Sequence, residues 1–213
     1  MKVLALADEP CKALWDFDTR KRLEGVDLIL SCGDLPAEYL EYLTNFTCAP
    51  LLYVHGNHDG KYAGHEPGGC INVDDRVYIW HGLRILGLGG CLRYNAQETY
   101  QYTEREMAHR IARLRWALHK SGGFDLLLTH APARGLNDEP DPAHRGFECF
   151  NKLLDTYQPQ WFLHGHVHLQ YDAKLPREDV RGATRIINAS ERYLFEIPDE
   201  PGTPAPEKRN RSL

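Results

Sequence analysis

The sequence lacks the long apolar runs and paired cysteines that mark several common protein classes. None of its apolar runs approaches the length of about 18 residues that a membrane span needs. The first run, residues 3–7, is too short for the core of a secretory signal, and no small-residue cleavage site follows it. We therefore expect a cytoplasmic protein with no membrane contact.

The 6 cysteines are widely spaced, and no two form a C-x-x-C pair. A thiolate zinc site requires such pairs, and disulfide frameworks belong mainly to short exported chains. We expect reduced thiols that are mostly buried.

Excess positive charge is also missing. The chain has 25 basic and 30 acidic side chains, a net charge of -5, and a pI near 6.1. This balance argues against a protein that binds long nucleic acid through its phosphates, although a local basic cleft remains compatible with it.

The organisation along the chain is that of one domain, residues 1–197, followed by a flexible tail, residues 198–213. The tail contains four prolines and almost no apolar side chains, so it cannot bury enough surface to become ordered. We find no internal repeat. Hydrophobic residues make up 42% of the chain, a normal value for a globular protein.

Short apolar runs alternate with helical patterns. Five runs are typical of strands buried on both faces: residues 3–7, 26–31, 51–55, 126–129 and 161–164. Residues 103–120 predict one amphipathic helix with a capping box formed by Thr103 and Glu106. Shorter helices are expected at 36–46 and 147–157, and hairpins at 76–87 and 184–197. This order indicates an α/β layered fold.

Histidine is abundant, with 11 residues, and much of it follows the predicted strands. Each of the five strands leads into side chains that bind metals; these are Asp8, Asp34, Asn57 with His58 and Asp59, His130, and His166 with His168. In an α/β sheet the loops after neighbouring strands converge on one edge, where ligands bind. A mixture of carboxylate, amide and imidazole groups suits divalent transition metals.

These segments carry a family resemblance. In order along the chain they are Asp8, Gly33-Asp34, Gly56-Asn57-His58-Asp59, Thr129-His130-Ala131-Pro132 and Gly165-His166-Val167-His168. The series resembles the ordered motifs of the calcineurin-like metallophosphoesterase superfamily, in a compact single-domain form of bacterial type, over residues 3 to about 195. The resemblance implies an α/β fold that is a four-layer α/β/β/α sandwich of two mixed sheets flanked by helices.

The resemblance also implies two divalent ions (Mn, Fe, Zn, Ni or Mg). Their expected ligands are Asp8, Asp34, Asn57, His130, His166 and His168. Asp34 would bridge the ions, Asp8 and His168 would complete the first site, and the other three would complete the second. His58 would be the catalytic imidazole that protonates the leaving group, and Asp59 would orient it.

The first motif departs from the family pattern. The usual Asp-x-His reads Asp8-Glu9-Pro10 here, and proline has no donor atom for a metal. Glu9, Cys11 or Asp16 could replace the missing imidazole, water could fill the gap, or the second ion could act largely alone. We favour a weak, solvated first site, because on an extended segment Glu9 should point away from Asp8.

Two further residues are candidates for substrate binding. Arg93 follows Gly89-Gly90 in a loop that could lie over the cleft, and arginine pairs well with phosphate oxygens. His144 lies in another such loop. A solvated turn is an equally good interpretation of the Arg93 segment.

The expected function is that of a metallophosphoesterase, hydrolysing a phosphomonoester or phosphodiester by metal-hydroxide attack with His58 as general acid. A small phosphoester is the expected substrate, and no obligate protein partner is evident. Residues 33–38 lack the Gly-Asp-x-Val-Asp-Arg-Gly motif of protein phosphatases. The alternatives are a non-catalytic metal-binding scaffold with the same fold and a nuclease acting on short oligonucleotides.

Overall fold

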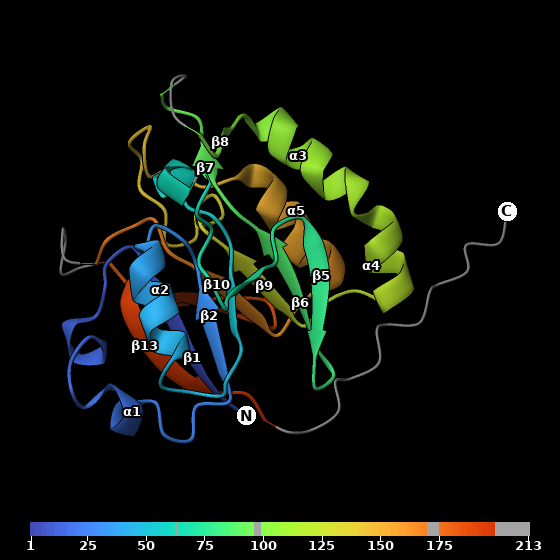
Figure 1. Ribbon diagram of the computed structural model, residues 1–213. Coiled ribbons are helices and arrows are strands. Elements are labelled where there is room, and N and C mark those ends of the chain that lie inside the picture. The colour runs from blue at the N-terminus through green and yellow to red at the C-terminus, as the bar shows by residue number, and fades with distance from the viewer. Residues whose placement is uncertain (63, 96–98, 170–174, 199–213) are drawn as a thin grey trace, which may run out of the picture.

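The computed structural model of the protein describes residues 1–62, 64–95, 99–169 and 175–198. Two large mixed sheets pack face to face, and helices flank them on both sides (Figure 1). The four-layer α/β/β/α fold is thereby confirmed. Residues 199–213 of the expected tail lie outside the described residues, so the division into domain and tail stays a prediction.

The first sheet has five strands. Their order is β13 (Glu191–Glu196), β1 (Lys2–Ala7), β2 (Leu28–Ser31), β3 (Leu51–Tyr53) and β4 (Ile71–Asn72). β1 to β4 run parallel, and β13 pairs with β1 in the antiparallel direction. The carboxyl ends of β1, β2 and β3 therefore meet at one edge.

The second sheet has six strands. Their order is β11 (Glu178–Arg181), β12 (Thr184–Asn188), β10 (Trp161–His164), β9 (Leu126–Thr129), β6 (Leu83–Leu88) and β5 (Arg76–Trp80). The inner four are parallel, and β5 and β11 are antiparallel edge strands. β7 (Cys91–Leu92) and β8 (Gln101–Tyr102) form a small parallel pair.

The central strands of both sheets are buried on both faces, which explains their continuous apolar runs. Val3 and Ala5 of β1 lie in the hydrophobic layer between the sheets, together with Leu128 and Leu163 of the second sheet. Leu6, which alternates with them, lies in the layer under the helices of the first sheet. A strand with two buried faces has no polar side to show in its sequence.

Five helices accompany the sheets: α1 (Thr19–Arg22), α2 (Ala37–Thr44), α3 (Glu104–Arg113), α4 (Arg115–Ser121) and α5 (Glu148–Tyr157). α2 covers the first sheet, while α3, α4 and α5 lie beside the second (Figure 1). Short 3-10 turns span Lys12–Leu14 and Asp59–Tyr62. Within the described ranges, no helix is both long and apolar enough to cross a membrane.

The helix predicted over residues 103–120 is two helices in the structure. Its start is confirmed, because Thr103 caps α3 in a capping box with Glu106. The backbone departs from the helix at Leu114, which ends α3 and precedes α4. Met107, Leu114 and Leu118 still lie in the layer that packs on the second sheet, so the predicted apolar face was correct.

One predicted hairpin is present and the other was wrong. Residues 76–87 form the antiparallel pair β5–β6. Residues 184–197 instead divide between the two sheets, since β12 pairs with β10 and β13 pairs with β1. The chain crosses at Ala189, whose amide donates to the His164 carbonyl, and at Ser190, which bridges to Ala7.

Candidate metal centre

Four predicted ligands from different loops lie together, and His130, which follows β9, is at their centre. Its Nε2 atom lies 2.9 Å from Asn57 Oδ1, 3.1 Å from His166 Nδ1 and 3.3 Å from Asp34 Oδ2. Asn57, His130 and His166 are all buried. The structure thus brings together the ligands that the resemblance implies for the second ion.

The outer hydrogen bonds of the two histidines define which ring nitrogens carry protons. His130 Nδ1 lies 2.8 Å from the Cys32 carbonyl, and His166 Nε2 lies 2.7 Å from the Ala143 carbonyl. A carbonyl oxygen only accepts, so each of these nitrogens donates. In the neutral rings, His130 Nε2 and His166 Nδ1 therefore present lone pairs toward each other.

Two oxygens add to this pair of nitrogens. Asn57 Nδ2 donates to the Tyr94 hydroxyl at 3.2 Å, which leaves its Oδ1 to face His130. Asp34 Oδ2 is a carboxylate acceptor on the same nitrogen. Three acceptor atoms, of Asp34, Asn57 and His166, thus lie close to His130 Nε2, and they repel a lone pair there unless a positive charge lies between them. These oxygen and nitrogen atoms are suitable ligands for a divalent cation.

The pKa values show where that charge lies in the metal-free protein. Burial lowers the pKa of His130, but the Asp34 and Asp8 carboxylates outweigh it and raise the pKa to about 9. Burial and the neighbouring His130 charge lower the pKa of His166 to about 3. His130 therefore holds a proton at neutral pH, at the position that a cation would take.

Asp8 belongs to the same centre. Its Oδ1 atom accepts from the His166 amide at 2.8 Å, while its buried Oδ2 has no hydrogen-bond partner among the described residues. Ligand atoms of Asp8, Asp34 and His130 all lie within 4.8 Å of one another. Burial raises the pKa of Asp8 to about 6. A buried carboxylate oxygen that accepts no hydrogen bond is well suited to bind a cation.

Gly165 allows the loop after β10 to approach Asp8 this closely. A Cβ atom at this position would lie 2.6 Å from Ala7 Cβ and 3.0 Å from Asp8 Oδ1. Any side chain would therefore push the two loops apart, and with them His166 and His168.

His168 lies nearer to solvent, and Glu9 accompanies it. Glu9 Oε1 is 3.3 Å from His168 Nδ1. The expectation that Glu9 points away from the site assumed an extended backbone. Asp8 has a φ of 67°, so the chain turns there and the strand alternation ends.

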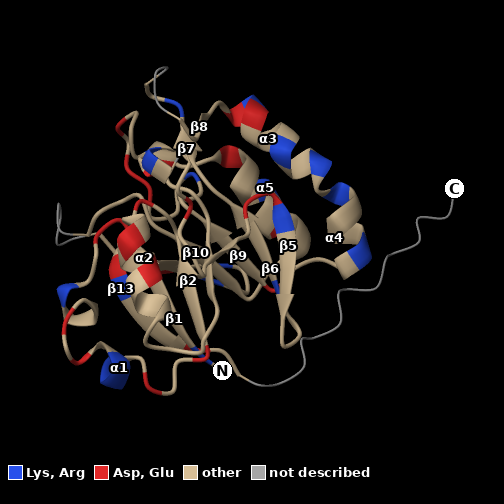
Figure 2. Cartoon of the chain, in the orientation of Figure 1, with Lys and Arg blue, Asp and Glu red and all other residues tan. Residues whose placement is uncertain are grey.

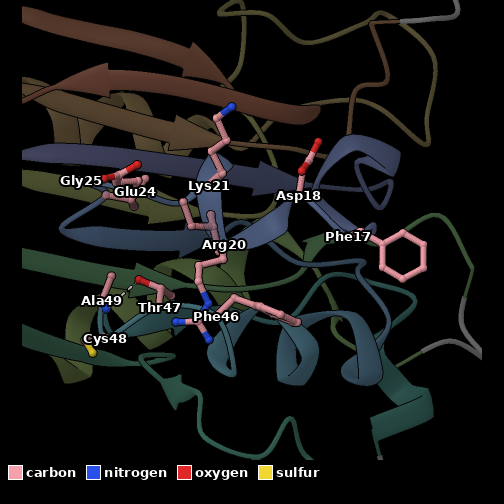
Figure 3. A pocket seen from close by; sticks show the side chains of 12 residues that line it. Phe17, Asp18, Arg20, Lys21, Glu24, Gly25, Phe46, Thr47, Cys48 and Ala49 are labelled. Atoms are coloured by element: carbon pink, nitrogen blue, oxygen red, sulfur yellow. Dashed lines mark hydrogen bonds between the residues drawn. The ribbon is translucent and has the colours of Figure 1, made fainter.

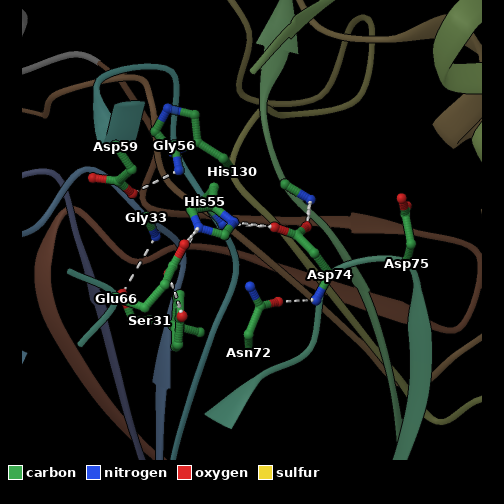
Figure 4. A network of polar contacts seen from close by, with 12 residues as sticks. Ser31, Gly33, His55, Gly56, Asp59, Glu66, Asn72, Asp74, Asp75 and His130 are labelled. Atoms are coloured by element: carbon green, nitrogen blue, oxygen red, sulfur yellow. Dashed lines mark hydrogen bonds and ion pairs between the residues drawn. The ribbon is translucent and has the colours of Figure 1, made fainter. Parts of the chain in front are cut away.

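His58 and Asp59 differ in their surroundings. The His58 side chain is exposed, and its backbone amide donates to Asp34 Oδ1 at 2.7 Å. Asp59 is fully buried, and its Oδ2 accepts from the amides of Asp34 and Gly56 at 2.8 Å each (Figure 4). These contacts show that Asp59 joins two site loops, and its orienting role toward the His58 imidazole stays a prediction.

A polar network around the buried His55, beside the site, was not predicted from the sequence. His55 Nδ1 lies 2.6 Å from Asp74 Oδ2, and His55 Nε2 lies 3.1 Å from Glu66 Oε2 (Figure 4). Tyr100 stacks on the His55 ring at 4.3 Å, and Asp74 also accepts from the Gly89 amide. The network fixes the loop that carries Asn57 and His58, and no local sequence signal marks Asp74 or Glu66 for it.

The two candidate substrate residues lie in different settings. The Arg93 guanidinium binds Glu106 at 2.9 Å and the Gln101 carbonyl at 3.1 Å, contacts at the start of α3. The His144 ring lies 5.4 Å from that of His166 and bonds Asp141 at 3.0 Å. The structure places His144 beside the centre, and it ties Arg93 to α3.

A separate surface hollow of about 650 Å³ lies between α1 and the loop after α2 (Figure 3). Its walls include Phe17, Arg20, Phe46 and Cys48, and none of the motif residues lines it. We assign it no part in the chemistry of the centre.

Three solved structures are similar to this chain. The solved structure of TT1561 from Thermus thermophilus is 18% identical, and the match covers 89% of both chains with a TM-score of 0.61. This likeness concerns the fold alone. The Thermus thermophilus sulfate thiohydrolase SoxB, in complex with glycerol, is 16% identical over 84% of this chain and 36% of that one, with a TM-score of 0.42. A diphosphatase of the PhnP family is 13% identical over 91% of this chain and 80% of that one, with a TM-score of 0.35.

No curated protein matched the sequence. A family model described as calcineurin-like phosphoesterase matches residues 7–170, a range that contains every motif discussed above. The chain therefore belongs to the calcineurin-like phosphoesterase family.

Proposed function

We propose that the protein is a cytoplasmic, metal-dependent hydrolase of a small phosphomonoester or phosphodiester. One observation carries the proposal: acceptor atoms of Asp34, Asn57 and His166 lie 2.9–3.3 Å from His130 Nε2. Such a set is stable only around a positive charge, and family membership supplies the reaction class.

The residues divide into two ion sites. His130 and the three side chains around it would hold the second ion, and Asp34 would also serve the first ion together with Asp8 and His168. Manganese, iron, zinc, nickel and magnesium are all compatible with these oxygen and imidazole ligands. When bound, such ions neutralise charge on the phosphoryl group and act as Lewis acids.

His58 would act on the leaving group. Its backbone is anchored to Asp34 by the 2.7 Å hydrogen bond from its amide, and its imidazole is exposed to an incoming substrate. A histidine near neutral pH can hold a proton and donate it to the oxygen that departs. We assign the proton donor role to His58 on this basis.

The charge of the surface supports a small substrate. Basic residues along α3 and α4 are separated by uncharged ones, and acidic residues lie at the start of α3 and on α2 (Figure 2). The net charge is -5. A long nucleic acid would need a continuous basic surface, so we propose a compact phosphoester with few phosphate groups.

Hydrolysis of p-nitrophenyl phosphate and bis-p-nitrophenyl phosphate with each of the five metals tests the proposal. We expect metal-dependent turnover that is lost in His130→Ala and kept in His109→Ala, which alters an exposed histidine of α3. A folded, metal-loaded protein that turns over neither ester, nor any member of a panel of natural phosphoesters, would favour the non-catalytic scaffold.

A further inference from the structure

The first ion site has lost one ligand of the family pattern, because Pro10 offers no donor atom. The rest of the site has been kept. Asp8 holds a buried Oδ2 atom with no hydrogen-bond partner among the described residues, and His168 follows β10 on the adjoining loop. A first ion in this site would therefore have one imidazole ligand fewer than the family pattern provides.

The backbone turns sharply at the first motif. Asp8 adopts a φ of 67°, a left-handed conformation that aspartate tolerates better than most residues. The Glu9 amide then donates to the Ala7 carbonyl at 2.7 Å. This turn gives the Glu9 side chain a direction that strand geometry would not allow.

The Glu9 side chain meets His168. The two residues are 159 positions apart in sequence, and Glu9 Oε1 lies 3.3 Å from His168 Nδ1. The His168 side chain is 23% exposed and that of Glu9 39% exposed, so the contact lies at the mouth of the centre. Because an ionised carboxylate only accepts, Nδ1 carries the hydrogen, and the neutral ring keeps its lone pair on Nε2.

We infer that Glu9 is a positioning residue for the first metal ion, holding His168 in the tautomer whose Nε2 atom can bind a cation. The inference rests on the proposed metal-dependent function. A carboxylate behind a ligating histidine fixes the ring and makes it a stronger ligand. Glu9 thus strengthens the remaining histidine and partly offsets the one that Pro10 removes.

Direct binding of the ion by Glu9 is the competing role. Among the described residues, neither Glu9 nor His168 belongs to the group of Asp8, Asp34 and His130 whose ligand atoms lie within 4.8 Å of one another, so that group does not separate the two roles. The contact between Glu9 Oε1 and His168 Nδ1 at 3.3 Å does bear on them, because it joins the carboxylate to the ring. The geometry therefore favours a carboxylate that acts through His168.

Two Glu9 variants of the full chain separate these roles by titration with Mn²⁺, followed by calorimetry. Glu9→Ala should weaken the first ion by about 10–100-fold and leave the second unchanged. Glu9→Gln keeps an oxygen that can accept from Nδ1, so its affinity should lie nearer to the wild type than to Glu9→Ala. Glu24→Ala is the matched control, because Glu24 is an exposed glutamate after α1 that none of the described contacts joins to the centre, and both affinities should stay unchanged.

Nitrogen-15 NMR of the histidine rings in the metal-free protein gives a readout that does not depend on activity. In the wild type, His168 should be protonated on Nδ1, and Glu9→Ala should move that population toward Nε2. Equal tautomer populations in wild type and Glu9→Ala, or a Glu9→Gln affinity as low as that of Glu9→Ala, would overturn the inference.

Failure of the inference can be told apart from failure of the proposed function. A wild-type protein that binds no divalent ion would overturn both. A wild type that binds two ions, with a first-ion affinity that Glu9→Ala does not change, would overturn the role of Glu9 alone.

Discussion

His130 Nε2 and His166 Nδ1 face each other at 3.1 Å, and each ring donates its other N–H to a backbone carbonyl. In the neutral rings neither facing nitrogen has a hydrogen to donate. The pair is therefore held together by the proton on His130 or by a cation in its place. The metal-dependent chemistry proposed for the protein requires a cation to replace the proton on His130.

Metal binding at the second site should release a proton. The pKa of His130 is about 9 in the metal-free protein. Burial lowers this pKa, but the Asp34 and Asp8 carboxylates outweigh burial and raise it above the usual value for histidine. Below the pKa of His130 the ion must displace the proton, so affinity should rise by about tenfold per pH unit and level off above the pKa. Calorimetry in buffers of different ionisation enthalpy should detect about one proton per ion. An affinity that is flat from neutral pH to about pH 9 would contradict this assignment.

The first ion should be held more weakly than the second. Pro10 removes one imidazole from its site, and the His168 and Glu9 side chains there are partly exposed to solvent. Dialysis against a chelator, followed by metal analysis, should leave less than one equivalent at the first site while the second keeps more. Two equivalents that resist the chelator equally would show that another group completes the first site.

His58→Ala should slow hydrolysis by about 10²–10⁴-fold for esters with poor leaving groups. The loss should be smaller for p-nitrophenyl esters, because p-nitrophenolate departs without a proton. Rates across a series of aryl phosphates should therefore depend more steeply on the leaving-group pKa in the variant. Metal affinity, measured on the same samples, should stay unchanged. An equal loss for every leaving group would argue against proton donation.

Asp59→Ala should act first on stability. The buried carboxylate accepts from the Asp34 and Gly56 amides, and its removal leaves two buried donors without a partner. We expect the free energy of unfolding to fall by about 3 kcal/mol, with a smaller loss in Asp59→Asn, which keeps one acceptor oxygen. Urea unfolding measures both. An Asp59 variant with normal stability and greatly reduced activity would instead indicate that Asp59 orients the His58 imidazole.

Local sequence patterns revealed the strands and the main ligands. The apolar runs at 126–129 and 161–164 coincide with β9 and β10, because a strand buried on both faces needs an unbroken run. His130 and His166 follow those strands directly. Their convergence with Asp34 could be expected, since the carboxyl ends of parallel strands share an edge.

Features set by distant contacts were not predicted. The positive φ of Asp8 redirects Glu9, and no periodic pattern reports a single left-handed residue. The sequence of β12 and β13 shows two adjacent strands but not that each pairs in a different sheet. Likewise, the contact between the Asp74 carboxylate and His55 joins residues 19 positions apart, and no local pattern reports it.

Anomalous diffraction from crystals soaked in Mn²⁺ would locate the second ion without reference to any substrate. We expect a strong peak bonded to His130 Nε2, His166 Nδ1, Asn57 Oδ1 and Asp34. In the same crystal, His130 Nδ1 should keep its contact with the Cys32 carbonyl. A protein that binds Mn²⁺ in solution but shows no peak among these four atoms would contradict the metal centre and the function proposed from it.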